Sequence, residues 1–376
     1  MKRIYIIIAS LIIMLTLTSC DEKKSDLLIL NWGDYISEDV ISLFEEEYGV
    51  SVRVATTDSN EQMLFNIQNK TAQYDLVVPS DYMVDQMASN GLLHKLDYSK
   101  LSNYRDDLFV EELQKLMNSD DCSHYEGYYV PYFWGSLGIM YSKRIEGVEE
   151  AVYEHGFKVL FDHELLPEGS KVAMYSASRD ALACAELYYG YSLNTTNSEE
   201  IDRCIDLLAT TNFYQWGTDD LKIDISQGKI DVALVYSGDF FDAYYADLEA
   251  EEDSEISNVD NYGIYSPKEH NNVFFDAFVI PNTTTNEDLA YKFIDFMLDY
   301  ENSYENALFI GYCPTLQEVY DDIMSDEENF GDLIAIDTYD PAKILNHEGS
   351  RAEVYKYLGD DIYAYIEKKF TKVFFR

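Results

Sequence analysis

Histidine and cysteine are the side chains best suited to hold a metal ion or to act as a nucleophile, and their spacing in this chain matches neither use. None of the six histidines lies four residues from another, the spacing that places two imidazoles on one face of a helix. The chain also contains no nucleophile elbow, P-loop, dinucleotide-binding glycine pattern or H-E-x-x-H motif. Cys122, Cys184, Cys204 and Cys313 fit no zinc pattern, which leaves open whether they form one or two disulfides or stay as buried thiols. We therefore expect no enzyme activity, no metal and no cofactor.

Carboxylates are by far the most abundant charged groups. The chain has 70 Asp and Glu residues against 27 Lys and Arg, which gives a net charge of −43. Nucleic acids and anionic membrane surfaces bind basic patches, so neither is expected as a partner. A cationic ligand suits this balance better. With so many acids, nearly any spacing between two carboxylates occurs, so such pairs do not indicate a glycosidase.

Cys20 differs from the other cysteines because it ends an apolar amino-terminal segment. Two basic residues among the first three precede residues 4–18, a largely apolar run that is too short for a comfortable membrane span. Leu17, Ser19 and Cys20 then resemble the lipobox of bacterial lipoproteins. We expect residues 1–20 to be a lipoprotein signal peptide ending at a lipidated Cys20, and residues 21–26 to be a tether. An ordinary secretory signal with an incidental cysteine is the alternative.

Strands and helices alternate in the part of the chain that follows. Residues 27–32 and 50–54 are typical of short apolar strands, and residues 74–78 are typical of a third, buried one. A helix between the first two strands is expected to begin at Ser37 and to stop at Gly49, and Ser59 is expected to open another. This β-α-β-α-β unit predicts an α/β fold in which a mostly parallel sheet is flanked by helices. Ligands of such sheets bind at the carboxyl ends of the strands, where residues 32–35 and 80–82 lie.

A second unit of the same kind follows, which indicates a second lobe. Strands are expected near residues 171–175 and 230–236, with helices near 180–189 and 199–209 between them. Two extended segments, 130–135 and 272–281, are expected to cross between the lobes and to act as a hinge. We expect lobe 1 to comprise residues 27–135 and 275–320, and lobe 2 to comprise residues 136–274 and 321–376.

Several strings of this sequence resemble the spermidine/putrescine-binding proteins of polyamine ABC transporters, which are bacterial extracellular solute-binding proteins of family 1. The resemblance extends from residue 27 to about residue 320. It implies a two-lobed, type II periplasmic-binding-protein fold that grips its ligand between the lobes and presents it to a membrane permease. The strings that carry it are residues 30–36, 58–63, 74–84, 131–135, 236–239, 274–276 and 310–315.

Polyamine chemistry calls for carboxylates around the ammonium groups and aromatic faces along the methylene chain. Carried over by resemblance, Asp276 is the ammonium anchor, and Asp34 and Ser80 meet an ammonium group in lobe 1. Asp180 and Asp239 are the acids of lobe 2. The full set of ligand-binding residues that the resemblance implies is Trp32, Asp34, Tyr35, Ser80, Tyr82, Asp180, Tyr236, Asp239, Phe274, Asp276 and Tyr312.

One departure from the family pattern bears on selectivity. Spermidine-preferring members carry a second acid three residues before the position of Asp180, and this chain has Ala177 there. Together with Asp34 and Asp239, this favours putrescine over spermidine. We expect a monomer at the outer face of the cell membrane or in the periplasm that delivers its ligand to an ABC permease. The alternatives are a binding protein for another small organic cation, a polyamine sensor and, less favoured, a surface hydrolase.

Overall fold

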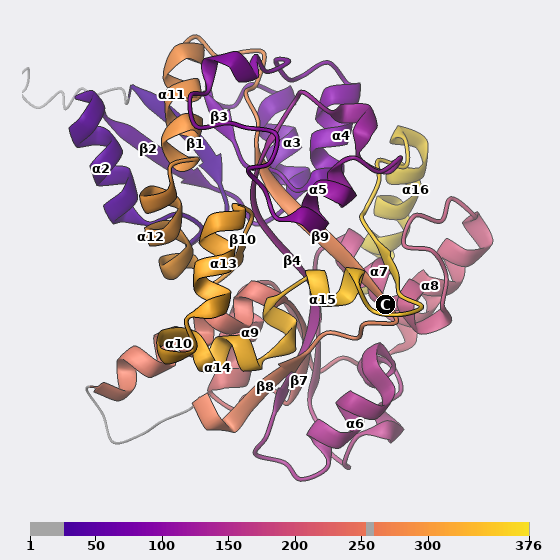
Figure 1. The fold of residues 1–376 in the computed structure, drawn as a ribbon. Coiled ribbons are helices and arrows are strands. Elements are labelled where there is room, and N and C mark those ends of the chain that lie inside the picture. Colours follow the sequence, from indigo (N-terminus) through magenta and orange to yellow (C-terminus); the bar gives the residue numbers. More distant parts are fainter. Residues whose placement is uncertain (1–25, 253–258, 376) are drawn as a thin grey trace, which may run out of the picture.

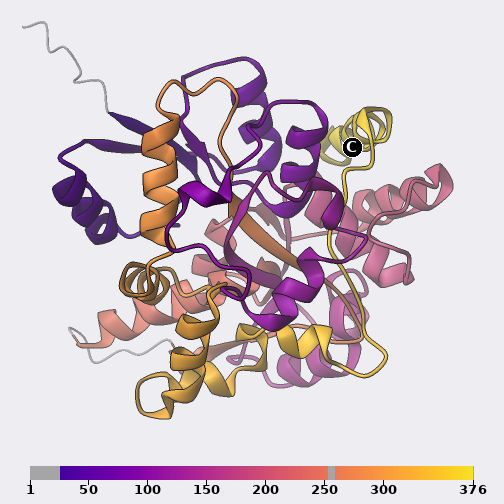
Figure 2. The ribbon, with the colours of Figure 1, turned by 45° about the horizontal axis from the view of Figure 1, so that its top comes forward.

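The computed structural model describes residues 26–252 and 259–375, which form a two-lobed α/β protein (Figures 1 and 2). In both views the helices α11 (Glu287–Met297) and α12 (Tyr300–Ile310), drawn in orange, lie beside the indigo and purple first part of the chain. No helix in the described ranges is long and apolar enough to cross a membrane. The predicted signal peptide with Cys20, and the predicted tether up to residue 25, lie outside the described residues.

The first lobe begins with a small parallel sheet in the order β2-β1-β3. All five residues of β1 are buried, as expected for a short apolar strand covered on both faces. Gly49 ends the first helix in the left-handed region (φ 66°), so both the helix stop and the β-α-β-α-β prediction are confirmed. Ser37 occupies the predicted cap position, but its side chain makes no capping bond; its N–H donates to Asn306 Oδ1 at 2.9 Å. The strands are β1 (Leu27–Asn31), β2 (Val52–Thr56) and β3 (Leu76–Val77).

The second lobe contains another parallel set of strands, in the order β6-β5-β7, of which the sequence predicted β5 and β7 but not β6. The four residues of β5 and the first four of β7 are buried, which accounts for their continuous runs of apolar residues. The strand β8 joins the same sheet through antiparallel pairing with β4. The strands are β5 (Val172–Tyr175), β6 (Gln215–Gly217), β7 (Val232–Tyr236) and β8 (Tyr262–Tyr265).

Two long strands, β4 (Val130–Ser142) and β9 (His270–Phe278), run through both lobes. Up to Ser136, β4 pairs antiparallel with β9, and from Leu137 onward it pairs with β7. Bridges between Val77 and Val279 and between Ser80 and Asp276 attach the first sheet to the end of β9. The short strands β10 (Cys313–Pro314) and β11 (Arg351–Glu353) pair with β4 and β9, respectively. Each long strand therefore forms ladders at both of its ends.

Helices surround both sheets (Figure 1). Their amphipathic faces supply much of the buried apolar surface, for example Val40 and Phe44 on the first of them. The helices not yet bounded are α2 (Glu38–Tyr48), α3 (Asn60–Gln68), α4 (Asp81–Ser89), α5 (Glu111–Met117), α6 (Val148–His155), α7 (Ser178–Tyr189), α8 (Ser198–Thr210), α9 (Asp220–Ser226), α10 (Ser237–Glu252), α13 (Gln317–Ser325), α14 (Glu327–Ala335), α15 (Ala342–Leu345) and α16 (Asp360–Phe370).

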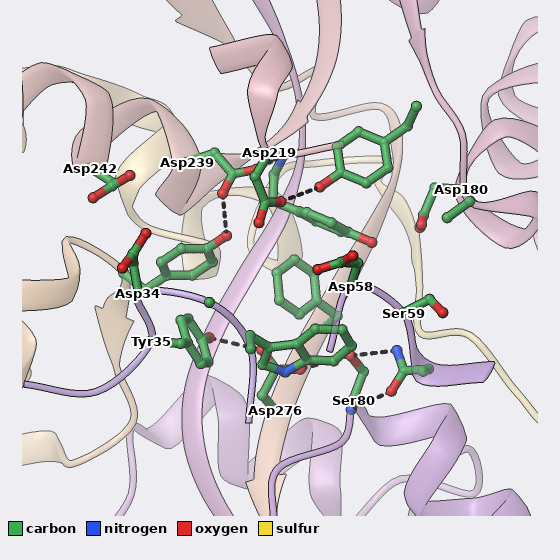
Figure 3. A pocket seen from close by; sticks show the side chains of 18 of the residues that line it. Asp34, Tyr35, Asp58, Ser59, Ser80, Asp180, Asp219, Asp239, Asp242 and Asp276 are labelled. Atoms are coloured by element: carbon green, nitrogen blue, oxygen red, sulfur yellow. Dashed lines mark hydrogen bonds between the residues drawn. The ribbon is translucent and has the colours of Figure 1, made fainter. Parts of the chain in front are cut away.

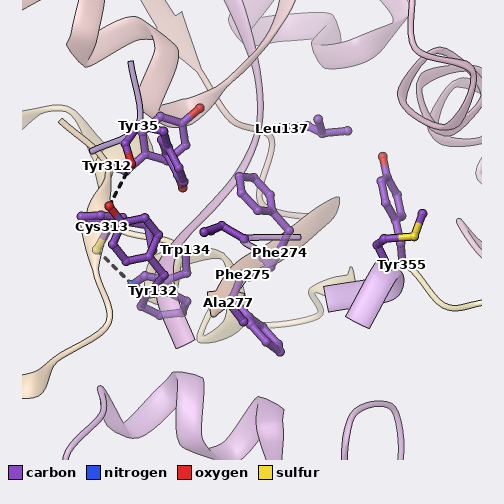
Figure 4. Close-up of a cluster of buried hydrophobic side chains, with 14 of the residues drawn as sticks. Tyr35, Tyr132, Trp134, Leu137, Phe274, Phe275, Ala277, Tyr312, Cys313 and Tyr355 are labelled. Carbon is purple, nitrogen blue, oxygen red and sulfur yellow. Dashed lines mark hydrogen bonds between the residues drawn. The ribbon is translucent and has the colours of Figure 1, made fainter. Parts of the chain in front are cut away.

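Aromatic side chains fill the space beneath the junction of β4 and β9 (Figure 4). Trp134 has no exposed surface, and its indole N–H lies 3.1 Å from Cys313 Sγ and 3.2 Å from the Pro314 carbonyl oxygen. The Tyr132 hydroxyl donates to the Tyr35 carbonyl oxygen at 2.8 Å. These contacts fix the crossing strands against the segment that carries Tyr35.

The four described cysteines are free and buried, which settles the alternative left open by their spacing. Burial also raises the pKa of the Cys184 and Cys313 thiols well above the usual range.

We predict that residues 26–376, expressed without the amino-terminal segment, show no thiol reactive toward a disulfide reagent in the native state and four after unfolding. Thiol titration without added reductant measures this, and fewer than four reactive thiols in the unfolded chain would contradict it.

Candidate ligand-binding site

A pocket of about 800 Å³, counting the part open to solvent, lies where the two lobes meet. Several of its walls are formed where strands end, as the parallel-sheet prediction requires: after β1, after β3 and at the end of β7. The strand β9 supplies another wall from the junction (Figure 3). The structure brings all the residues of the predicted set to this pocket, namely Trp32, Asp34, Tyr35, Ser80, Tyr82, Asp180, Tyr236, Asp239, Phe274, Asp276 and Tyr312.

Asp276 lies between two hydroxyl donors from lobe 1. The Tyr35 hydroxyl donates to its Oδ2 at 2.8 Å, and the Ser80 hydroxyl donates to its Oδ1 at 2.7 Å. Asn60 holds Ser80 in place by accepting from its N–H and donating to its Oγ, both at 3.1 Å. Burial raises the pKa of the Asp276 carboxyl to about 6, although the two hydroxyls favour its charged form. The carboxylate is thus desolvated and oriented by neutral groups.

Asp180 is the third residue of α7, in the first turn of that helix in the second lobe. It is not the helix cap, because Ala177 occupies that position and also lines the pocket. The Tyr355 hydroxyl donates to Asp180 Oδ1 at 3.3 Å. Burial raises the pKa of this carboxyl to about 6 as well, and nearby Glu61 acts in the same direction. The second lobe therefore also presents a desolvated carboxyl to the pocket.

Asp239, in the first turn of α10, accepts a hydrogen bond at each of its carboxylate oxygens. Its Oδ1 accepts from the Tyr312 hydroxyl at 3.1 Å, and its Oδ2 accepts from the Tyr236 N–H at 3.2 Å. Gly238 makes the first contact possible, because a Cβ there would lie 1.9 Å from Cδ2 of the Tyr312 ring. Burial raises the pKa of Asp239 to about 6, against the opposing effect of Lys222.

Aromatic rings form the walls between these acids. Tyr35 and Tyr312 meet edge to face with centroids 5.0 Å apart, and Tyr236 and Phe274 do so at 5.2 Å. Such rings offer apolar faces with partial negative charge, which suits both methylene groups and ammonium groups. The half-buried Trp32 adds a further ring, whose buried N–H has no acceptor among the described residues.

Asp34 differs from the other predicted acids because its side chain is exposed. Its φ of 48° lies in the left-handed region, which aspartate adopts more readily than most residues with a side chain. A Cβ added at the neighbouring Gly33 would lie more than 4 Å from every described atom beyond its chain neighbours, so the turn is open there. This turn carries the chain from Trp32 to Tyr35 at the rim of the pocket.

The sequence reasoning missed several residues that line the pocket. Glu61 accepts from the Tyr82 hydroxyl at 3.2 Å and from the Tyr363 hydroxyl of α16 at 3.1 Å. Glu61 belongs to residues 58–63, one of the strings that resemble the family, and this resemblance could have indicated its place in the pocket. Nothing in the sequence around Lys222 indicated that it lines the pocket. The lining residues outside the predicted set are Gly33, Asp58, Ser59, Asn60, Glu61, Tyr175, Ala177, Asp219, Lys222, Asp242 and Ile310.

The pocket as a whole is strongly acidic. Eight carboxyl side chains and one lysine line it. In the described part of the chain, no group of three or more His, Cys, Asp or Glu side chains is arranged to hold a metal ion. Buried carboxylates separated by aromatic faces can bind an organic cation with an apolar middle.

Comparison with known proteins gives relatives over most of the chain. A spermidine/putrescine-binding periplasmic protein of Salmonella typhimurium is 29% identical over 290 residues, 76% of each chain. The putrescine-binding periplasmic protein SpuD of Pseudomonas aeruginosa is 31% identical over 278 residues, 72% of each chain. Among solved structures, a putative spermidine/putrescine ABC transporter from Listeria monocytogenes superposes with a TM-score of 0.75 at 31% identity, covering 93% of this chain and 99% of the other.

The family model described as a bacterial extracellular solute-binding protein matches residues 39–331. These residues include both long strands, β4 and β9, and most of the predicted ligand-binding residues. The three that lie outside the match are Trp32, Asp34 and Tyr35. The two-lobed fold agrees with the solved relatives. The chain therefore belongs to the bacterial extracellular solute-binding proteins.

Proposed function

We propose that this protein captures a short polyamine, putrescine and/or spermidine, in the pocket between its lobes and delivers it to an ABC permease. The observation that carries the proposal is the Asp276 carboxylate: it is 5% exposed, and its described hydrogen-bond donors are the neutral hydroxyls of Tyr35 and Ser80. A buried carboxylate without a counter-charge is costly, and a ligand ammonium would supply that charge. The names of the relatives support the same ligand class.

The energetics of such a complex are favourable. A charge-assisted hydrogen bond from an ammonium to a carboxylate contributes about 1.5–3 kcal/mol. A desolvated ammonium over an aromatic ring adds about 0.5–2 kcal/mol. Two carboxylates and several rings therefore offset the association cost for a small ligand. In this arrangement Asp276 and Asp180 hold the ammonium groups while Trp32, Tyr35 and Phe274 cover the methylene chain.

The proposal extends to how the protein works in the cell. Cys20 anchors the chain to the membrane through lipid, and residues 21–26 form the tether. The two lobes, with the division that we propose from the sequence, close on the ligand, and the closed monomer docks on the permease. The protein performs no catalysis, since the pocket groups are suited to holding an ammonium group.

Calorimetry with residues 26–376 tests the proposal directly. Putrescine, cadaverine, spermidine and spermine should be titrated at low and moderate salt. We expect binding of at least one of the first three at about micromolar Kd or tighter, corresponding to about −8 kcal/mol. Absence of binding to all four at either salt concentration would overturn the proposed function.

Asp276→Asn should weaken binding by at least about 2 kcal/mol, or roughly 30-fold in Kd, because a desolvated ammonium loses its counter-charge. The control is Asp288→Asn, which makes the same charge change at an exposed position of α11 outside the pocket. Both variants are titrated calorimetrically with the tightest ligand. A loss below about 1 kcal/mol for Asp276→Asn would show that the anchor lies elsewhere.

Affinity should also depend on pH. Burial raises the pKa values of Asp276, Asp180 and Asp239 to about 6 in the ligand-free protein. A ligand ammonium favours the ionised carboxylate, so binding lowers the pKa values of the carboxyls that it meets, Asp276 and Asp180, and releases protons. Affinity should therefore fall as the pH drops through 6, by up to about tenfold per pH unit for each carboxyl that pairs with the ligand. Titrations at pH 7.5, 6 and 5 in buffers of different ionisation enthalpy measure both effects; constant affinity over this range would contradict the assignment.

A further inference from the structure

Lys222, in α9, places a protein ammonium group inside an otherwise acidic pocket. Its Nζ lies 2.7 Å from Asp242 Oδ2 and 3.5 Å from Asp239 Oδ1, and its side chain is only 12% exposed. Burial lowers the pKa of Lys222, but Asp239 and Asp242 raise it by more, so the net effect is a raised pKa and the side chain is charged. It is the one basic residue that lines the pocket in the described part of the chain.

Two buried acids of the pocket, Asp276 and Asp239, differ in the groups that surround them. Asp276 accepts one hydroxyl at each oxygen. Asp239 accepts the Tyr312 hydroxyl and the Tyr236 N–H, and Lys222 approaches the oxygen that Tyr312 already contacts. Each carboxylate therefore accepts two hydrogen bonds, and the two differ in the charge beside them. Asp239 has the Lys222 ammonium 3.5 Å from its Oδ1, whereas the described partners of Asp276 are neutral hydroxyls, so Asp276 keeps room for a ligand ammonium.

The two other acids near Asp239, Asp219 and Asp242, are more exposed than Asp239 and do not provide a second buried negative charge for a ligand ammonium. Asp219 is exposed and accepts from the Tyr175 hydroxyl at 2.8 Å, and the side chain of Asp242 is 32% exposed. Water and salt screen exposed charges far more than buried ones. Figure 3 shows these acids together with Asp239, apart from Asp276 and from Asp180. Asp239 is thus the most buried carboxylate at this end of the pocket, and Lys222, which it shares with Asp242, is the cation beside it.

We propose that Lys222 determines specificity by occupying, as a built-in ammonium group, the place at Asp239 that a third ligand ammonium would need. The pocket then binds diamines in preference to triamines. This inference rests on the proposed polyamine function and names the ligand class more closely. It assigns Asp239 a role in positioning Lys222 and Tyr312, and leaves Asp276 and Asp180 as the acids that meet the ligand.

The physical reason is repulsion between like charges at short range. An ammonium of spermidine directed toward Asp239 would meet Lys222 within a few ångströms, in a region where water screens poorly. A diamine that spans the other acids avoids this contact. Replacing Lys222 by a neutral side chain removes the repulsion and exposes Asp239 to the ligand.

The test compares Lys222→Met with the unaltered protein by calorimetric titration with putrescine and spermidine. We expect the ratio of the putrescine Kd to the spermidine Kd to rise by at least about tenfold in the variant. Lys229→Met is the matched control: it removes a lysine paired at 2.7 Å with Asp224, just beyond the same helix but 58% exposed and outside the pocket. Its ratio should stay within about twofold of the unaltered protein.

A second variant guards against loss of folding. Lys222→Gln keeps a hydrogen-bond donor for Asp242 and should shift the ratio in the same direction; thermal unfolding checks that each variant is folded. If this ratio of Kd values is unchanged or falls in both folded variants, the proposed role of Lys222 is wrong. Binding of putrescine by the unaltered protein would in that case still support the proposed function. If the unaltered protein binds neither amine, the proposed function itself fails.

Discussion

The Asp276 carboxylate is the point on which the arrangement of the pocket depends. It sits on β9 where that strand bridges to Ser80, so its position is set by backbone pairing between the first sheet and a strand shared by both lobes. Two neutral hydroxyls orient it without cancelling its charge. A buried carboxylate without a counter-charge raises the free energy of the empty pocket. A bound cation removes this unfavourable term, which strengthens binding.

The other acids of the pocket are carried by different elements. Asp180 and Asp239 lie in the first turns of α7 and α10, which follow β5 and β7 in lobe 2. Helix amino-termini favour carboxylates, so these positions moderate the cost of burying charge there. The pocket thus combines one acid fixed by a strand with two fixed by helix starts.

Much of the fold was predictable from the sequence because its signals are local. The apolar strands 27–32 and 171–175 and the stop at Gly49 follow from side-chain pattern and from one left-handed residue. The pocket residues came instead from strings that resemble a family, since 33 tyrosines and 70 acids make residue type alone uninformative. Their gathering in one pocket agrees with that resemblance, while their contacts with ligand remain predictions.

What the sequence did not reveal depends on contacts between distant segments. Tyr355 and Tyr363 reach Asp180 and Glu61 from the carboxyl-terminal part of the chain, 175 and 302 residues away, respectively. Lys222 reaches the pocket because the short helix α9 packs beside α10, and nothing in its local sequence separates it from a solvated lysine. Such placements follow from how the elements pack together, which no local pattern encodes.

The shared ladder of β4 and β9 has a mechanical consequence. The paired positions of this ladder run from Val130 opposite Phe278 to Ser136 opposite Val273, with one register shift between Pro131 and Phe133. They resist sliding and shearing, because either motion would break the pairing along the ladder. Bending across this ladder, in contrast, keeps most of the pairs intact. We therefore expect the pocket to widen by rotation of the lobes about β4 and β9 and not by sliding of one lobe past the other.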